Sequence, residues 1–172
     1  AFIILILLVM NYFKFKYPDS KDQINKLPYN LPKFFCALIF FQISFGALVS
    51  GLDAGQIYQS WPLMGSSYFP NDSDLRDIFH WDFFNNPSLL QFFHRNIAYL
   101  IIVYFLIMFF IIFNNKKFIH LKKTTIYVLL ALLFQVILGI FTILSGAQIL
   151  FASMHQTVSI ILIISSLFLI RK

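Results

Sequence analysis

Long apolar runs separated by short polar connections dominate this sequence. Four runs, at about residues 34–52, 97–113, 125–145 and 152–170, are predicted to be helices that cross a membrane. About 20 apolar helical residues span the hydrocarbon core of a bilayer, and a helix satisfies its own backbone hydrogen bonds there. Residues 1–13 are also apolar but too few to span upright, so we expect them to be the tail of a truncated transmembrane helix. The predicted fold is an all-α membrane protein, a four-helix transmembrane bundle preceded by a partial helix.

The charged residues between these runs predict an orientation. Lysines crowd the connection 14–33, the connection after residue 113 and the C-terminus, whereas most of the aspartates lie within 53–91. Because basic loops remain on the cytoplasmic or matrix side, 14–33 is predicted to be a cytoplasmic or matrix loop and 53–91 a long outer loop. The aromatic residues of that loop predict a short interfacial helix at about 74–83, folded over the mouth of the bundle.

An internal repeat divides the predicted bundle into two hairpins. Residues 41–47 (FQISFGA) and 134–140 (FQVILGI) share Phe, Gln and Gly in register. Each copy is followed by an inward-running helix that begins with a histidine. We therefore expect two hairpins related by an approximate two-fold axis, with a site buried at their interface. The repeated residues are Gln42, Gly46 and His94 in the first copy and Gln135, Gly139 and His155 in the second.

The two histidines are the strongest candidates for chemistry. Ionisable side chains inside a membrane span are costly and usually functional. Imidazole is a strong axial ligand of haem iron, and two imidazoles fill both axial positions, which suits electron transfer. We predict that His94 and His155 bind one iron porphyrin between them. The alternative is that each histidine caps its helix and binds a lipid headgroup or water.

Other polar residues near the histidines are candidates for cofactor contacts. Gln42 with Gly46, and Gln135 with Gly139, are spaced i, i+4 on one helix face. Glycine there lets a flat ring or a neighbouring backbone approach, although small-residue helix packing explains it equally well. Arg95 is a candidate partner for an outward-pointing porphyrin propionate, with snorkelling to the headgroups as the alternative.

Composition narrows the remaining possibilities. The chain has 172 residues, of which 59% are hydrophobic. Its net charge of +6 comes from loop residues that set topology, so we expect a lipid bilayer and no nucleic acid as its surroundings. The single cysteine, Cys36, excludes an internal disulfide and a cysteine-based metal cluster. His80 and His120 are predicted to be solvated.

A family resemblance appears at this point. The stretch GALVSGLDAG at 46–55, followed by YQSWPLM at 58–64, resembles the signature after the fifth helix of haem A synthases, the cytochrome-oxidase assembly enzymes of bacteria and mitochondria. QFFHR at 91–95 and MHQ at 154–156 resemble the starts of the sixth and eighth helices. The resemblance extends from about residue 34 to the end. Phe93 departs from it, because the family often has a polar residue there.

The resemblance implies a fuller picture. It implies eight helices formed by duplication of a four-helix bundle, with this chain as the C-terminal half and 34–172 as its haem-binding bundle. It implies that His94 and His155 ligate a haem b, and that the enzyme is an oxidoreductase. The enzyme would convert haem O to haem A by hydroxylating the C8 methyl group twice. The catalytic half would be absent from this chain, so its catalytic residues are unknown.

The resemblance also implies partners and a location. These are haem O synthase upstream, an electron donor, and the bacterial or mitochondrial inner membrane. Two alternatives remain open: a bis-histidine, cytochrome b-like carrier without hydroxylase activity, and a haem- or quinone-handling scaffold. A visible spectrum distinguishes the scaffold, which would show no low-spin haem bands, from the other two.

Overall fold

Four long helices form the bundle in the computed structural model, which describes residues 8, 11–12, 27 and 30–171. They are α2 (Leu31–Gly51), α3 (Pro87–Asn114), α4 (Lys122–Leu144) and α5 (Ile149–Arg171). Each is long and apolar enough to cross a membrane. The described residues form no β-strand, and their other elements are short 3₁₀ helices. The predicted all-α membrane fold is confirmed.

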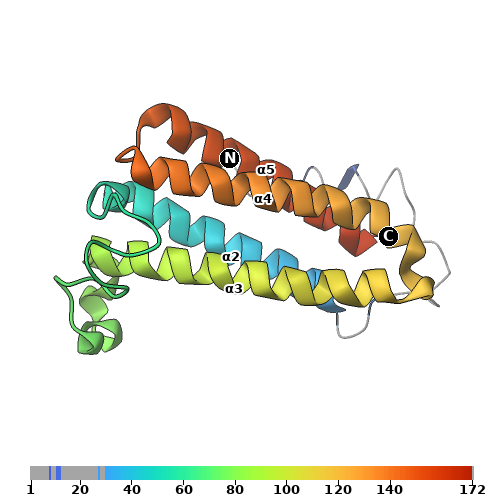
Figure 1. Ribbon diagram of the computed structural model, residues 1–172, viewed down its shortest axis with the longest axis horizontal. Coiled ribbons are helices and arrows are strands. Elements are labelled where there is room, and N and C mark those ends of the chain that lie inside the picture. The colour runs from blue at the N-terminus through green and yellow to red at the C-terminus, as the bar shows by residue number, and fades with distance from the viewer. Residues whose placement is uncertain (1–7, 9–10, 13–26, 28–29, 172) are drawn as a thin grey trace.

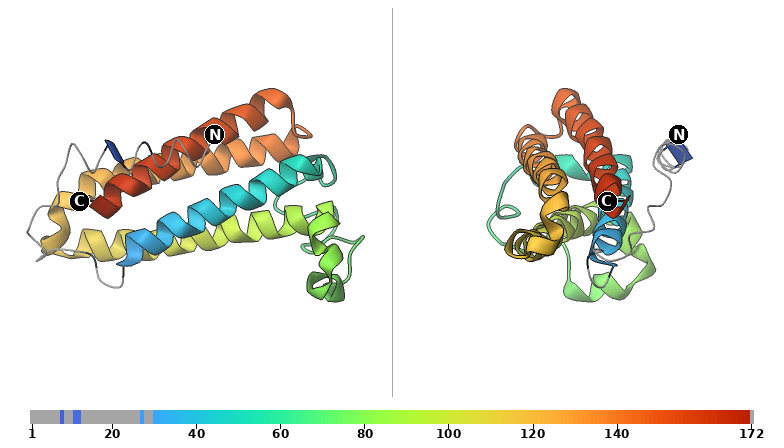
Figure 2. Two further views of the ribbon diagram at one scale, coloured as in Figure 1. Left: turned by 180° about the vertical axis from the view of Figure 1, so that it is seen from behind. Right: turned by 90° about the vertical axis from the view of Figure 1, so that its right-hand side faces the viewer.

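The helices pack as two hairpins. α2 lies along α3, α4 lies along α5, and α2 also packs on α5, which joins the hairpins (Figure 1). The segment between α2 and α3 and the turn between α4 and α5 lie at one end, and the C-terminus lies at the other (Figure 2). The 3₁₀ helix η6 (Lys116–Leu121) connects α3 to α4 at that second end. Because η6 carries basic residues, we call the end of the bundle that contains η6 and the C-terminus the inner end. The end that contains the turn between α4 and α5 is the outer end.

The helices α3 and α5 begin earlier than the apolar pattern predicts. α3 begins at Pro87, where the Asn86 side chain accepts a hydrogen bond from a backbone N–H of the first turn and proline occupies an initial position. α5 begins at Ile149. The prediction that His94 and His155 stand at helix entrances is therefore wrong, since both lie inside their helices. Polar residues in the first turns interrupt the apolar run without interrupting the helix.

The outer segment between α2 and α3 is built from short 3₁₀ turns: η3 (Ala54–Gln56), η4 (Leu75–Phe79) and η5 (Trp81–Asn85). The prediction of one interfacial helix at 74–83 is wrong, because the extended backbone of His80 separates η4 from η5. The side chains on either side of this break, Phe79 and Trp81, are 90% and 92% exposed.

The outer ends of the two hairpins touch. Gly146, in the turn between α4 and α5, has φ +67°, and a Cβ there would lie 3.0 Å from the side chain of Gln59. A Cβ on Gly55 would lie 3.1 Å from that of Ala147. The segment that follows α2 therefore rests directly on the turn of the second hairpin and covers the outer end of the bundle.

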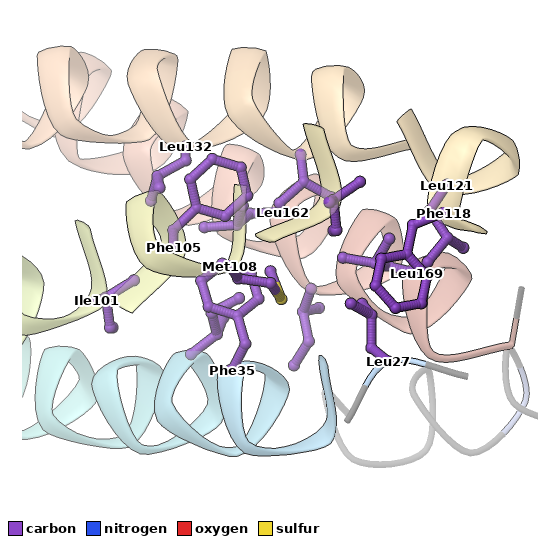
Figure 3. Close-up of a cluster of buried hydrophobic side chains, with 14 residues drawn as sticks. Leu27, Phe35, Ile101, Phe105, Met108, Phe118, Leu121, Leu132, Leu162 and Leu169 are labelled. Atoms are coloured by element: carbon purple, nitrogen blue, oxygen red, sulfur yellow. The ribbon is translucent and has the colours of Figure 1, made fainter. Parts of the chain in front are cut away.

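The main hydrophobic core occupies the inner half of the bundle (Figure 3). In every helix its buried members lie on the inner side of the repeated glutamine and histidine. A second, smaller cluster beneath the outer segment contains Phe83, Leu89 and Leu90. The members of the main core within the four helices are Phe35, Ile39, Ile101, Phe105, Met108, Ile112, Val128, Leu132, Leu162, Ile163 and Leu169.

The predicted partial helix 1–13 and the loop 14–33 fall largely outside the described residues.

Candidate functional site

His94 projects from α3 toward α2, where it meets Gln42. The Gln42 amide nitrogen donates to the His94 carbonyl oxygen at 2.9 Å and lies 3.2 Å from His94 Nε2. Because a carbonyl oxygen only accepts, the Gln42 atom is the nitrogen, and its second hydrogen points to Nε2. In this arrangement Nε2 accepts, so the neutral imidazole of His94 carries its proton on Nδ1.

His155 makes the corresponding contact in the second hairpin. Its Nδ1 lies 3.0 Å from the Gln135 carbonyl oxygen, and its Nε2 lies 3.3 Å from the Gln135 side-chain nitrogen. Nδ1 must donate to the carbonyl, so Nε2 is again the acceptor. Both hairpins therefore hold a histidine as the same tautomer, with the Nε2 lone pair facing a glutamine amide.

The repeated glycines make room for these rings. A Cβ on Gly46 would lie 3.1 Å from His94 Cε1, and a Cβ on Gly139 would lie 3.0 Å from His155 Cε1. By contrast, a Cβ on Gly51 would have no neighbour within 4 Å. The flat ring that approaches each repeated glycine is thus the imidazole of the same hairpin.

The two imidazoles occupy corresponding positions in the two hairpins. Both are half-buried. Three polar atoms around them are buried without a hydrogen-bond partner: Gln42 Oε1, Gln135 Oε1 and His94 Nδ1. The described residues contain no cluster of three or more His, Cys, Asp or Glu side chains suited to a metal ion. A haem iron needs only two axial ligands from the protein, and two neutral imidazoles protonated on Nδ1 would fit it if each Nε2 exchanged its glutamine amide for the metal.

Arg95 points away from the repeated histidines and toward the outer segment. Its guanidinium donates to the carbonyl oxygens of Tyr58 (3.0 Å), Ser60 (2.9 Å) and Leu63 (3.3 Å). The side chain is only 6% exposed, and Nε has no partner. It does not reach toward the headgroups as the snorkelling alternative requires, and the propionate contact stays a prediction.

Sequence reasoning missed the rest of this polar face of α3. Gln91, which is 2% exposed, donates to the Tyr58 carbonyl at 2.9 Å. Tyr99 accepts a hydrogen bond from the Trp61 indole at 3.1 Å. Polar side chains recur every four residues at Gln91, Arg95 and Tyr99, and this spacing could have predicted a polar face on the helix.

A further anchor joins the outer segment to the start of α3. Asp72 accepts hydrogen bonds from the Tyr58 hydroxyl at 3.0 Å and the Ser88 hydroxyl at 2.6 Å. Partial burial acts to raise the pKa of Asp72, but the bonds from Ser88 and Tyr58 outweigh it and hold the pKa below its ordinary value. Burial, together with Asp72, raises the pKa of Tyr58. His80 and His120 are exposed, as predicted.

Comparison with known proteins places this geometry in a family context. Residues 1–167 match the COX15-CtaA family model, described as cytochrome oxidase assembly protein. A protein of Pelagibacter ubique (strain HTCC1062) named Heme A synthase is 44% identical over 146 residues, which cover 85% of this chain and 42% of that protein. A Heme A synthase of Rickettsia bellii (strain OSU 85-389) is 42% identical over 149 residues, with 83% and 42% covered. This chain therefore spans less than half the length of these relatives. No solved structure matches it.

Proposed function

This chain belongs to the COX15-CtaA family of cytochrome oxidase assembly proteins, and from that premise we propose that it forms the haem-b-bearing part of a haem A synthase. In this proposal His94 and His155 are the two axial ligands of the haem. The observation that supports the proposal is the repeated set of glutamine, glycine and histidine, which gives both imidazoles the same tautomer at corresponding positions of the two hairpins.

The residues of the chain have defined tasks in this proposal. Gly46 and Gly139 let the rings approach their partner helices, and Gln42 and Gln135 select the tautomer whose Nε2 lone pair can bind a metal. The contact between the outer segment and the second hairpin's turn would shield the site from water. A haem bound by two imidazoles would supply one-electron transfer, because both of its axial positions are filled.

The reaction of the full-length enzyme is part of the same proposal. It is the conversion of haem O to haem A by successive hydroxylation of the C8 methyl group, an oxidoreductase reaction, and this half would deliver electrons to it. Haem O synthase would supply the substrate, and a separate donor would supply the electrons. Four membrane-length helices and bacterial relatives support a multi-pass protein of the inner membrane.

A chimeric enzyme tests the proposal directly. Residues 34–172 would replace the matching segment of the Pelagibacter ubique relative, in a bacterium that makes haem O but no haem A. We expect haem A, measured by chromatography of extracted haems, with the unsubstituted chimera and with the exposed-site control His80→Ala, but not with His155→Ala. Haem A formation by the His155→Ala chimera would contradict the proposal.

A cytochrome b-like electron carrier is the second candidate. The same observation favours it, because two axial imidazoles leave the iron no open position for oxygen. A chimera that binds low-spin haem but forms no haem A would support the carrier over the synthase.

A further inference from the structure

The two histidines are not held equally, although their hairpins repeat. In the second hairpin, His155 Nδ1 donates to the Gln135 carbonyl oxygen at 3.0 Å. In the first, His94 Nδ1 is buried and has no partner. Both Nε2 atoms face a glutamine amide, so the difference lies in Nδ1 alone.

This difference matters for a metal ligand. Histidines that bind metals usually donate their second N–H to a carbonyl or carboxylate, which fixes the ring and makes the ligating nitrogen more basic. His155 already has that support from a helix backbone that cannot rotate away. His94 lacks it, so its ring is oriented only through the contacts at Nε2 and the packing against Gly46.

The lengths of the connections within the two hairpins also indicate that His155 is held more firmly than His94. Gln135 and His155 are 20 residues apart and are joined through the short turn between α4 and α5. Gln42 and His94 are 52 residues apart and are joined through the whole outer segment. A longer connection constrains the relative position of its ends less. The distance from Gly139 to its histidine is also shorter, since a Cβ there would lie 3.4 Å from His155 Nδ1, against 3.8 Å for Gly46 and His94 Nδ1.

We propose that the two axial ligands have unequal roles: His155 is the anchoring ligand that retains the haem, and His94 is the exchangeable one. The proposal rests on the proposed function, since it concerns the same haem site. A small neutral ligand would then be able to replace His94 at the iron, but would not be able to replace His155.

Two matched variants test this inequality. His94→Gly and His155→Gly would be expressed in membranes of a haem-producing bacterium, with insertion checked by protein yield after mild solubilisation. We expect His94→Gly to keep its haem in a high-spin form that binds carbon monoxide and returns to low spin when imidazole is added. We expect His155→Gly to retain at least about tenfold less haem, because removal of a ligand should cost no less than removal of the group that supports a ligand. Equal haem loss in the two variants, or greater loss in His94→Gly, would overturn the proposal.

A second pair of variants keeps both histidines. It tests the same inequality if the two glycine variants do not insert into the membrane. Gly139→Ala would place a Cβ 3.0 Å from His155 Cε1 and push the ring from the Gln135 carbonyl, whereas Gly46→Ala would disturb only His94. We expect haem retention to fall more in Gly139→Ala, and the reverse order would overturn the inequality. Failure of the proposed function looks different: without the haem site the unsubstituted protein would show no low-spin haem, and without the synthase activity it would bind low-spin haem while the chimera forms no haem A.

Discussion

The substitution Arg95→Met would remove a buried cation that binds the outer segment to α3. The guanidinium donates to three carbonyl oxygens, but two of them keep other partners. The Tyr58 carbonyl still accepts from Gln91, and the Leu63 carbonyl still accepts from the Ser60 hydroxyl. Among the described hydrogen bonds, only the Ser60 carbonyl loses its one partner.

The expected loss of stability follows from the one carbonyl that is left without a partner. Leaving the part-buried Ser60 carbonyl without a partner costs about 1–3 kcal/mol, and removal of the buried guanidinium charge offsets part of the lost charge-assisted bonds. We therefore expect the closed form of the outer segment to lose about 2 kcal/mol, which raises the population of its open form roughly 30-fold.

Hydrogen exchange measured by mass spectrometry on a peptide covering 58–64 provides the assay. We expect exchange there to accelerate by roughly the same 30-fold factor, while peptides from the middle of α4 stay unchanged. Arg76→Met is the matched control, because the Arg76 side chain pairs with Asp74 at the surface and is 87% exposed. An unchanged exchange rate at 58–64 in Arg95→Met would refute the reasoning.

Two further predictions concern the glycines and the acidic anchor. Gly46→Ala should shift the visible spectrum of the bound haem toward the high-spin form, because the new Cβ would lie 3.1 Å from His94 Cε1. Gly51→Ala is the control and should leave the spectrum unchanged, since a Cβ there would have no neighbour within 4 Å. Identical spectra for the two variants would contradict the contact between Gly46 and His94. The pKa of Asp72 is lowered in the folded protein, so its bonds stabilise the outer segment above the unfolded pKa and are lost as the pH falls through the folded one. Acidification below about pH 4 should therefore loosen this segment, as followed by the fluorescence of the two tryptophans it contains. The variant Asp72→Asn should lack this change in fluorescence on acidification. A change of the full size in the variant would mean that other carboxylates cause it.

The bundle could be predicted from sequence because lipid imposes simple rules. A membrane-spanning helix needs a long apolar run, and basic loops mark one side. The pairing of Gln42 with Gly46 and of Gln135 with Gly139 was visible as a repeat, and the structure brings each pair to its histidine.

Other features depended on interactions that no apolar pattern records. The start of α3 is fixed by the Asn86 cap rather than by hydrophobicity, so the depth of His94 within its helix could not be read from the run. The direction of Arg95 depends on where the backbone of 58–63 passes, which is a tertiary contact. The unequal Nδ1 environments of His94 and His155 differ by a single hydrogen bond, although the two sequence repeats look alike.

The central claim is that His94 and His155 bind one haem between them. Low-temperature electron paramagnetic resonance of the oxidised, haem-loaded protein tests it most directly, because the signal reports the axial ligands. We expect a low-spin, bis-imidazole signal that disappears in both His94→Gly and His155→Gly and persists in His80→Ala and His120→Ala, whose side chains are exposed. A low-spin signal that survives unaltered in either glycine variant would contradict the claim.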